Sequence, residues 1–294
     1  MKFGTVAIVG RPNVGKSTLL NGLLGEKIAI VSDKPQTTRT RILGLLHLPE
    51  AQVVLLDTPG LHDPQHLLNK RMVRTAMETV READLVYMMV DATSRSWAVD
   101  RPVVEQVGRV LAQDPKPAFL LINKVDLVSK PRVLPLIEAY SQMWEWAEIV
   151  PLSAKTMVNV DRLLDLTKKQ LRDSQALYAE DMLTDQSMRT LAAELIREKI
   201  LHHTRQELPH SVAVAIELFL EDDRLARIAA TIFVEKETQK PIVIGKRGER
   251  LKAVGTAARL EMEQLFHKKV ALDLWVKVRS GWREDGQMLA ELGY

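Results

Sequence analysis

The feature that most constrains the fold is the stretch GRPNVGKST, at residues 10–18, which stands between the apolar runs TVAIV and LLNGLL. From Gly10 to Ser17 it fits the pattern G-x-x-x-x-G-K-S, and the flanking runs predict a strand before it and a helix after it. Glycines let successive backbone N–H groups turn toward one anion, and a helix N-terminus adds partial positive charge. The stretch therefore predicts a phosphate-binding loop rather than a plain strand-to-helix turn.

Each side chain of this loop has an expected task. Lys16 can reach the β- and γ-phosphates of a nucleotide, and the Ser17 hydroxyl can bind Mg²⁺. The loop alone does not separate ATP from GTP. The residues predicted to hold the phosphates are Gly10, Arg11, Pro12, Asn13, Val14, Gly15, Lys16, Ser17 and Thr18.

Up to about residue 172, short apolar runs alternate with amphipathic segments. The runs are 6–10, 53–57, 85–91, 118–123 and 149–153, and the candidate helices lie near 15–24, 67–82, 101–112, 131–146 and 159–172. Such alternation predicts an α/β P-loop NTPase fold, with a mostly parallel sheet and helices on both faces. Four runs end at Gly10, Asp57, Asn123 and Ser153, and the carboxyl ends of parallel strands share one edge where ligands bind.

The remainder of the chain follows a different order. It contains a helix (186–206), two strands (211–219 and 226–235), a turn (245–248), helices (249–267) and a strand (270–278), which predict a smaller α+β domain. We therefore expect a first domain at 1–172, a linker at 173–184 and a second domain at 185–294, which ends in a short helix within 281–292. Trp275 and Trp282 are predicted to pack inside this second domain.

Composition limits the remaining classes. The chain has 294 residues, no cysteine and a net charge of +3. The absence of cysteine excludes disulfides and thiolate metal sites and suits a reducing compartment. No apolar run approaches the roughly 20 residues of a membrane span, and the N-terminus lacks the pattern of a secretory signal. We expect a cytoplasmic protein, and its net charge is weak evidence for a nucleic-acid partner.

Two further strand ends predict a guanine site. Asp126, in the tetrapeptide Asn123-Lys124-Val125-Asp126, can accept from guanine N1–H and the exocyclic amine together. Adenine lacks this donor pair, and such a mismatch can discriminate by roughly 10⁴-fold. Asn123 can bond N7 of the base and brace the loop, and the stem of Lys124 can lie over the base plane.

The tripeptide after the fifth run completes the predicted base site. It reads Ser153-Ala154-Lys155, and the Ala154 N–H could bond guanine O6. Together these segments resemble the G1, G3, G4 and G5 boxes of the translation-factor class of GTPases, and the bacterial Era family above all. The resemblance extends to KPQTTR (34–39), DTPGLH (57–62), TDQSMRTLAAELIREKI (184–200) and KPIVIGKRGERLKAVG (240–255), and so spans nearly the whole chain.

The resemblance implies two switch loops. In the second, which reads Asp57-Thr58-Pro59-Gly60-Leu61, Asp57 would hold a Mg²⁺-bound water and the Gly60 N–H would sense the γ-phosphate. In the first, Thr38 would close over Mg²⁺ and the γ-phosphate, with Thr37 as the rival candidate. The predicted first switch is Gln36, Thr37, Thr38, Arg39 and Thr40. The predicted catalytic residues are Lys16, Thr38, Gly60 and Asn13, and the predicted Mg²⁺ ligands are Ser17, Thr38 and, through water, Asp57.

Leu61 stands where Ras-type GTPases place a water-orienting glutamine. Because leucine cannot donate or accept, the resemblance implies a hydrophobic-substituted GTPase with slow intrinsic turnover. Asn13 matches a potassium-coordinating asparagine of related GTPases, so K⁺, a partner or both would raise the rate. His62 is a less favoured candidate for a base.

Gly245-Lys246-Arg247-Gly248 fits the pattern G-x-x-G, which is weak alone but lies in an α-β-β-α-α-β order. This order resembles a type II KH domain, whose loop clamps about four nucleotides of single-stranded RNA. The residues predicted to bind RNA are Ile242, Val243, Ile244, Gly245, Lys246, Arg247, Gly248, Arg250 and Lys252, and Lys236, Lys240 and Arg259 extend the basic stretch.

The family resemblance implies a monomeric GTPase that uses Mg²⁺ and GTP/GDP. It would bind the 3′ end of 16S ribosomal RNA during assembly of the small ribosomal subunit. One alternative is a membrane-associated signalling GTPase that couples growth or cell-cycle state to translation, with peripheral contact on the cytoplasmic side of the membrane. Another is a nucleotide-gated scaffold whose KH-like fold no longer binds RNA.

Overall fold

The computed structural model describes residues 1–34, 36–204, 208 and 211–294. The chain divides into two compact units. Unit 1 comprises residues 1–29, 38–64 and 71–185, and unit 2 comprises 30–37, 65–70 and 186–294. Within the described residues, no helix combines the length and the apolar character needed to cross a bilayer.

Unit 1 is built on one sheet with the strand order β2-β3-β1-β4-β5-β6. Its strands are β1 (Lys2–Gly10), β2 (Ile42–Leu48), β3 (Ala51–Asp57), β4 (Leu85–Asp91), β5 (Ala118–Asn123) and β6 (Glu148–Pro151). All neighbours pair in parallel except β2, which runs antiparallel to β3. The expected mostly parallel sheet is confirmed, but the prediction had no strand at β2.

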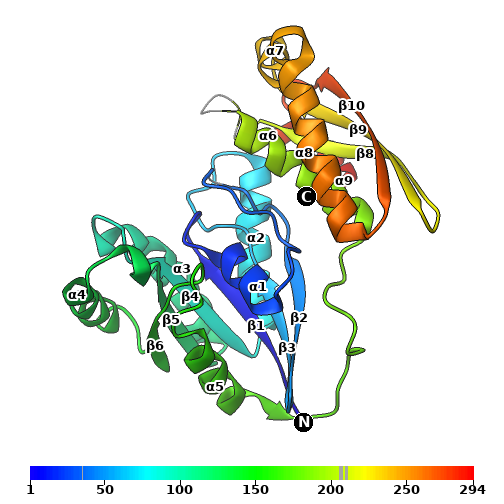
Figure 1. Cartoon of the computed structure of the whole chain (residues 1–294). Coiled ribbons are helices and arrows are strands. Elements are labelled where there is room, and N and C mark those ends of the chain that lie inside the picture. Colours follow the sequence, from blue (N-terminus) through cyan, green and yellow to red (C-terminus); the bar gives the residue numbers. More distant parts are fainter. Residues whose placement is uncertain (35, 205–207, 209–210) are drawn as a thin grey trace. The chain divides into compact units, whose positions relative to one another are not determined.

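Helices cover both faces of this sheet (Figure 1). They are α1 (Lys16–Leu24), α2 (Leu67–Glu82), α3 (Arg101–Gln113), α4 (Lys130–Ser141) and α5 (Val160–Gln170), with short 3-10 turns η1 (Trp97–Asp100) and η2 (Val125–Leu127). Leu19 of α1 and Leu163 of α5 are buried in the core on one face, with Ile8 of β1. Ala76 of α2 and Tyr140 of α4 are buried on the other. Two buried cores explain why the central strands are apolar on both faces.

The stretch expected to be a linker packs on unit 1. The short strand β7 (Arg172–Asp173) pairs antiparallel with β1, and an isolated bridge joins Thr184 to Gly44 of β2. Tyr178 and Met182 pack on a small core formed by the side chains of Leu45, Val54 and Leu56.

Unit 2 contains a three-stranded sheet with the order β10-β9-β8. Its elements are α6 (Met188–His203), β8 (Ala213–Glu221), β9 (Leu225–Val234), η3 (Glu237–Gln239), α7 (Lys240–Ile244), η4 (Lys246–Gly248), α8 (Glu249–Phe266), β10 (Lys269–Val278), η5 (Trp282–Glu284) and α9 (Gly286–Glu291). The predicted α-β-β-α-α-β order is confirmed. The last two residues of the helix expected at 186–206 lie outside the described residues.

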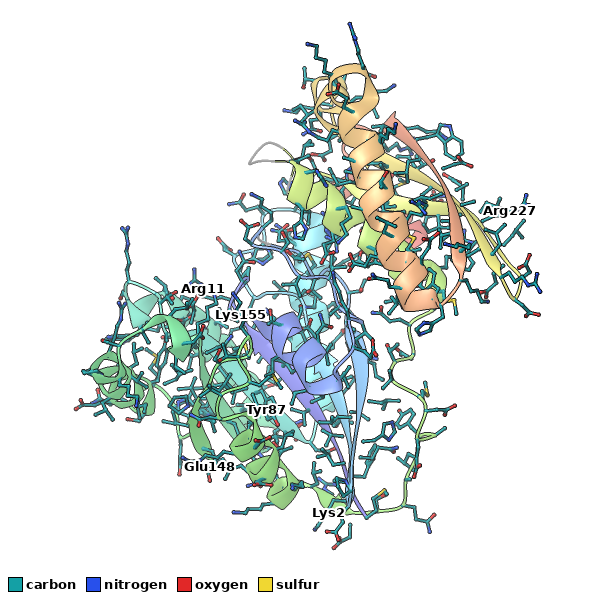
Figure 2. All side chains as sticks on the ribbon, in the orientation of Figure 1. Lys2, Arg11, Tyr87, Glu148, Lys155 and Arg227 are labelled. Carbon is teal, nitrogen blue, oxygen red and sulfur yellow. The ribbon has the colours of Figure 1, made fainter. Side chains whose placement is uncertain are left out.

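Helices α6 and α8 pack on one face of the sheet of unit 2. Ile196 of α6 and Ala258 of α8 share a core with Ile228 and Val270 of the sheet. Every second side chain of a strand points to the opposite face of the sheet, which these helices do not cover. Arg227 of β9 is an example (Figure 2). Trp275 lies on that open face and is 50% exposed, so its expected burial was wrong, because strand alternation turns it away from the helices. Trp282 is fully buried, as expected.

Candidate functional site

The loop after β1 wraps around the start of α1. Its backbone is left-handed at Asn13 (φ 64°) and at Gly15 (φ 108°), where a Cβ would collide with the Asn123 side chain. Lys16 folds across the loop and donates to the carbonyls of Gly10 (3.3 Å) and Arg11 (3.0 Å). Arg11 and Lys155 mark one end of the sheet, and Lys2 marks the other (Figure 2). The loop thus has the geometry of an anion cradle at the carboxyl end of β1.

Three oxygen-bearing side chains meet beside this loop. The Ser17 hydroxyl donates to Asp57 Oδ2 (2.6 Å), and Ser17 Oγ lies 2.9 Å from Thr38 Oγ1. Asp57 is completely buried, and its Oδ1 has no hydrogen-bond partner among the described residues. Two hydroxyls and a carboxylate with an unsatisfied oxygen are the donor set that Mg²⁺ prefers, so these residues fit that ion.

Burial shifts the pKa values of Asp57 and of Lys16 beside it. It raises the pKa of Asp57 to about 6 and lowers the pKa of Lys16 to about 8, while the attraction between the two groups opposes each shift. The site therefore holds a positive charge for phosphate and a negative charge for a metal on two buried side chains.

The two candidate switch threonines differ in their surroundings. Thr38 contributes its hydroxyl to the cluster with Ser17. Thr37, in unit 2, donates its hydroxyl to the Lys34 carbonyl (2.6 Å). Of the two, only Thr38 has the geometry of a metal ligand here. Of the other first-switch residues, Arg39 is buried and Gln36 has a left-handed backbone (φ 60°).

The loop after β3 closes against the phosphate loop. The Leu61 N–H donates to the Gly10 carbonyl (3.0 Å), and the Thr58 hydroxyl donates to Ile8 O (2.8 Å). A Cβ on Gly60 would lie 2.7 Å from Pro12, so only glycine fits there. The Leu61 side chain is fully buried in the core beneath α2 and does not face the loop.

Asn123 ties three loops together. Its side-chain amide donates to the Val14 carbonyl (2.7 Å), and its Oδ1 accepts from the Ala154 N–H (2.8 Å). The bracing role expected of Asn123 is thus visible. The N–H of Ala154, expected to bond guanine O6, is engaged with Asn123 instead. Ser153 and Lys155 lie at the same strand edge, after β6.

The neighbouring residues reveal a partner that the sequence reasoning missed. Lys124 donates to the Asn13 carbonyl (2.8 Å) and forms an ion pair with Asp91 (2.6 Å) at the end of β4. Asp91 could have been found, because it ends the third apolar run just as Asp57 ends the second. Asp126 is exposed two residues after Lys124, and its expected role as the reader of the base stays a prediction.

A second missed group lies behind Arg11. Asp100 is fully buried, accepts from the Tyr140 hydroxyl (2.6 Å) and lies 3.8 Å from the Arg11 guanidinium. Burial raises the pKa of Asp100, and the hydrogen bond from Tyr140 opposes the rise. No motif marks this group, because its members are far apart in the sequence and buried.

Unit 2 carries the glycine-flanked loop between α7 and α8. Gly245 (φ 76°), Arg247 (φ 52°) and Gly248 (φ 80°) have positive φ angles, and the Lys246 and Arg247 side chains are exposed. A groove of about 390 Å³ begins at this loop and runs between α8 and β10. It is lined by Gly248, Leu251, Lys252, Gly255, Thr256, Arg259, Leu272 and Leu274.

Two residues expected to face RNA have structural tasks. Val243 is only 1% exposed and belongs to the core, because α7 turns this position inward, so the prediction that it contacts bases was wrong. Arg250 donates to the Ile242 carbonyl in the middle of α7. Lys252 and Arg259 line the groove, whereas Leu272 and Leu274 of β10 were missed, since strand alternation alone does not show which face meets a groove.

Comparison with known proteins agrees with this geometry. Residues 5–124 match the family model of the 50S ribosome-binding GTPases, and residues 207–283 match that of the KH domain. The chain is 50% identical to the GTPase Era of Geobacter metallireducens, with 100% of this chain and 98% of that protein covered. It is 48% identical to the GTPase Era of Syntrophus aciditrophicus, with 100% and 95% covered.

Two solved structures share the whole fold. One is an Era variant from Aquifex aeolicus bound to GDP·AlF₄⁻, and the other is Era in complex with MgGDPNP and nucleotides 1506–1542 of 16S ribosomal RNA. Each has a TM-score of 0.95 and 43% identity and covers 100% of this chain and 99% of its own. With this identity over its full length, the chain belongs to the Era family of GTPases.

Proposed function

We propose that the protein binds and hydrolyses GTP with Mg²⁺ and binds the 3′ end of 16S ribosomal RNA during assembly of the small ribosomal subunit. The observation that carries the GTPase part is the convergence of Ser17, Thr38 and Asp57 beside the phosphate loop. The RNA part rests on the basic G-x-x-G loop, on its groove and on the relative solved with 16S ribosomal RNA. The proposed domain limits are 1–172 for the GTPase domain, 173–184 for the connecting segment and 185–294 for the KH domain.

The chain's own residues divide the work. Lys16 and the backbone N–H groups of the loop would hold the phosphates, and Ser17, Thr38 and Asp57 would hold Mg²⁺. The ion would neutralise charge that develops between the β- and γ-phosphates. Asp126 would select guanine. Asn123 would fix the base loops relative to the phosphate loop through its hydrogen bonds to Val14 and Ala154.

Intrinsic turnover is proposed to be slow. The Leu61 side chain is buried and turned into the core, so it cannot orient a water molecule. Asn13 lies in the loop at φ 64° and would bind K⁺ next to the phosphates, where a cation offsets developing charge. GTP would act as a timer, because loss of the γ-phosphate releases the switch loops and changes the affinity for RNA.

A single pair of variants tests the RNA part. Gly248 has φ 80° and open space where a Cβ would stand, and both Asp and Asn tolerate a left-handed backbone. Gly248→Asp adds a negative charge beside the phosphates of bound RNA, whereas Gly248→Asn is its neutral match. We expect Asp to abolish binding of the 16S 3′-end RNA and Asn to retain most of it. Equal affinities of both variants and the native chain would favour the scaffold hypothesis.

Cytoplasmic location, a monomeric state and peripheral membrane contact remain predictions. Liposome flotation at physiological salt tests the membrane contact, and light scattering of the full chain tests the monomeric state. Protein that floats with vesicles in the absence of RNA would favour the signalling alternative.

A further inference from the structure

The segment 174–185, here called the strap, follows a fixed course on unit 1. It begins at Ser174, whose N–H donates to the Met1 carbonyl (3.0 Å), and it continues along the β2 side of the sheet (Figure 1). Tyr178 stacks on Phe3 with 6.5 Å between ring centroids. Tyr178 and Met182 also pack on the side chains of Val54 and Leu56 in this part of the sheet. The strap therefore completes a core and does not act as a free tether.

One buried side chain fastens the first part of the strap. Gln52 of β3 is only 2% exposed. Its Oε1 accepts from the N–H groups of Leu177 (2.9 Å) and Tyr178 (3.0 Å), and its Nε2 donates to the Tyr178 carbonyl (2.9 Å). A buried amide that meets three backbone groups supplies the pairing that a neighbouring strand would supply.

The second part of the strap pairs with the free edge of β2. The Leu45 N–H donates to the Leu183 carbonyl (2.8 Å), and the Thr184 hydroxyl donates to the Leu43 carbonyl (2.7 Å). Between them, Thr184 forms an antiparallel bridge with Gly44. His47 Nε2 adds a further hydrogen bond to the Met182 carbonyl (2.8 Å). Such pairing covers the exposed edge of the sheet.

The strands that hold the strap connect the two switch loops. β2 begins at Ile42, two residues after the last residue of the first switch, and β3 ends at Asp57, which accepts from Ser17 in the metal cluster. Gly44 of β2 also packs on α1, because a Cβ there would lie 2.7 Å from Leu20. A shift of either switch that moves this hairpin would change the contacts that the strap makes.

We propose that the strap senses the nucleotide state through the β2–β3 hairpin, with Gln52 as its anchor and Thr184 as its moving contact. Three residues after Thr184 comes Ser187, which caps α6, the first helix of unit 2. A change at Thr184 is therefore passed on through the backbone to the start of that unit. This inference rests on the proposed function, because it explains how GTP would control RNA affinity. Gln52 and Thr184 are positioning residues, because neither belongs to the phosphate loop, the base loops or the G-x-x-G loop.

The test uses the full chain and matched variants. Thr184→Val keeps the shape and the β-branch but loses the hydroxyl that donates to Leu43 O, whereas Thr184→Ser keeps a hydroxyl. Gln52→Met keeps the volume and loses the hydrogen bonds to Leu177, Tyr178 and His47. The affinity for 16S 3′-end RNA is measured with GDP and with a non-hydrolysable GTP analogue, and the ratio of the two Kd values is the readout.

We expect Thr184→Val and Gln52→Met to reduce this ratio by about fivefold, the value of one hydrogen bond. Thr184→Ser should keep the native ratio, and the affinity for GTP should stay unchanged in all three variants. A native ratio in both Thr184→Val and Gln52→Met would overturn the proposal.

Hydrogen–deuterium exchange of residues 174–185 separates this inference from the proposed function. If the native chain binds RNA equally in both nucleotide states, the timer part of the proposed function fails. Hydrogen–deuterium exchange then tests the strap alone. Protection of residues 174–185 that differs between GDP and the GTP analogue supports the proposal that the strap senses the nucleotide, and equal protection overturns it.

Discussion

The Ser17 hydroxyl donates a 2.6 Å hydrogen bond to the Asp57 carboxylate, across 40 positions of sequence. The contact exists because the phosphate loop leads from the end of β1 into α1, and β3 pairs in parallel with β1 and ends beside it. The parallel sheet thus brings a hydroxyl and a carboxylate together at one edge, where each could bind the same metal ion.

Replacement of Asp57 should remove the metal dependence of nucleotide binding. Asp57→Asn loses the negative charge but keeps the shape, and a hydrogen bond to a charged group is worth about 1.5–3 kcal/mol. We expect Mg²⁺ to slow release of fluorescent GDP from the native chain, and this slowing to shrink at least about tenfold in the variant. The exposed Asp161→Asn provides the control. An unchanged ratio of release rates in Mg²⁺ and in EDTA would exclude Asp57 from the metal site.

Base selection should depend on Asp126. Asp126→Asn turns an acceptor pair into one acceptor and one donor, which suits xanthine better than guanine. We expect the preference for GTP over xanthosine triphosphate to fall by roughly 10⁴-fold, as measured by competition against fluorescent GDP. Glu145→Gln, which removes an exposed charge outside the site, should leave the preference intact. If Asp126→Asn keeps the native preference, another group reads the base.

Local patterns were enough to predict most of the sheet and the motif loops. The central strands are apolar on both faces, so their runs stand out, and each motif follows such a run. β2 was missed because Gly44 and His47 interrupt its apolar pattern. The structure shows why they occur there: Gly44 makes room for Leu20 and Leu24 of α1, and His47 bonds to Met182.

Contacts between distant residues could not be predicted in the same way. The segment 173–184 looks like a linker in composition, yet Gln52 holds its backbone from 125 and 126 positions away. The pair of Asp100 and Tyr140 is hidden for the same reason. Every residue except proline has a backbone N–H and C=O, so the sequence of a segment does not show whether a distant side chain bonds to them. Composition alone therefore does not distinguish a segment that is fixed on the domain from a free linker.

The proposed potassium site can be tested without disturbing the loop. Asn13 has φ 64°, a conformation that glycine adopts freely, so Asn13→Gly removes the side-chain oxygen and keeps the backbone. We expect the native chain to hydrolyse GTP more than about tenfold faster in K⁺ than in Na⁺, and the variant to lose this difference. Single-turnover hydrolysis at matched ionic strength measures it. Equal native rates in the two salts would remove K⁺ from the mechanism.

The buried pair of Tyr140 and Asp100 should make stability depend on pH. Burial raises the pKa of Asp100 above its unfolded value, so the stability linked to its proton is lost as the pH rises through the folded pKa. Tyr140→Phe removes the hydrogen bond that opposes this rise. We expect it to cost about 1–3 kcal/mol of unfolding free energy at pH ~8 and less at pH ~4, because a hydrogen bond to an ionised carboxylate is worth more than one to a neutral carboxyl. Urea unfolding at both values measures the difference, and an equal cost at both would contradict this explanation.

Salt dependence should show how the G-x-x-G loop meets RNA. Lys246 and Arg247 are exposed, and Arg247 has φ 52°, so Arg247→Asn keeps the left-handed backbone and Lys246→Gln keeps the stem. For single strands, log K falls with log salt by about 0.7 for each phosphate contact. The double variant should therefore weaken binding of the 16S 3′-end RNA and reduce the slope by about 1.4.

Lys277→Gln is the matched control for this double variant, because Lys277 is exposed on β10, on the open face of the sheet and away from the groove. It removes one charge from the same unit and should leave the slope unchanged. If the slope falls equally in the control, the position of the removed charge does not matter. The net charge of the unit, rather than a contact at the loop, would then attract RNA. A slope that the double variant leaves unchanged would mean that the loop does not touch phosphates.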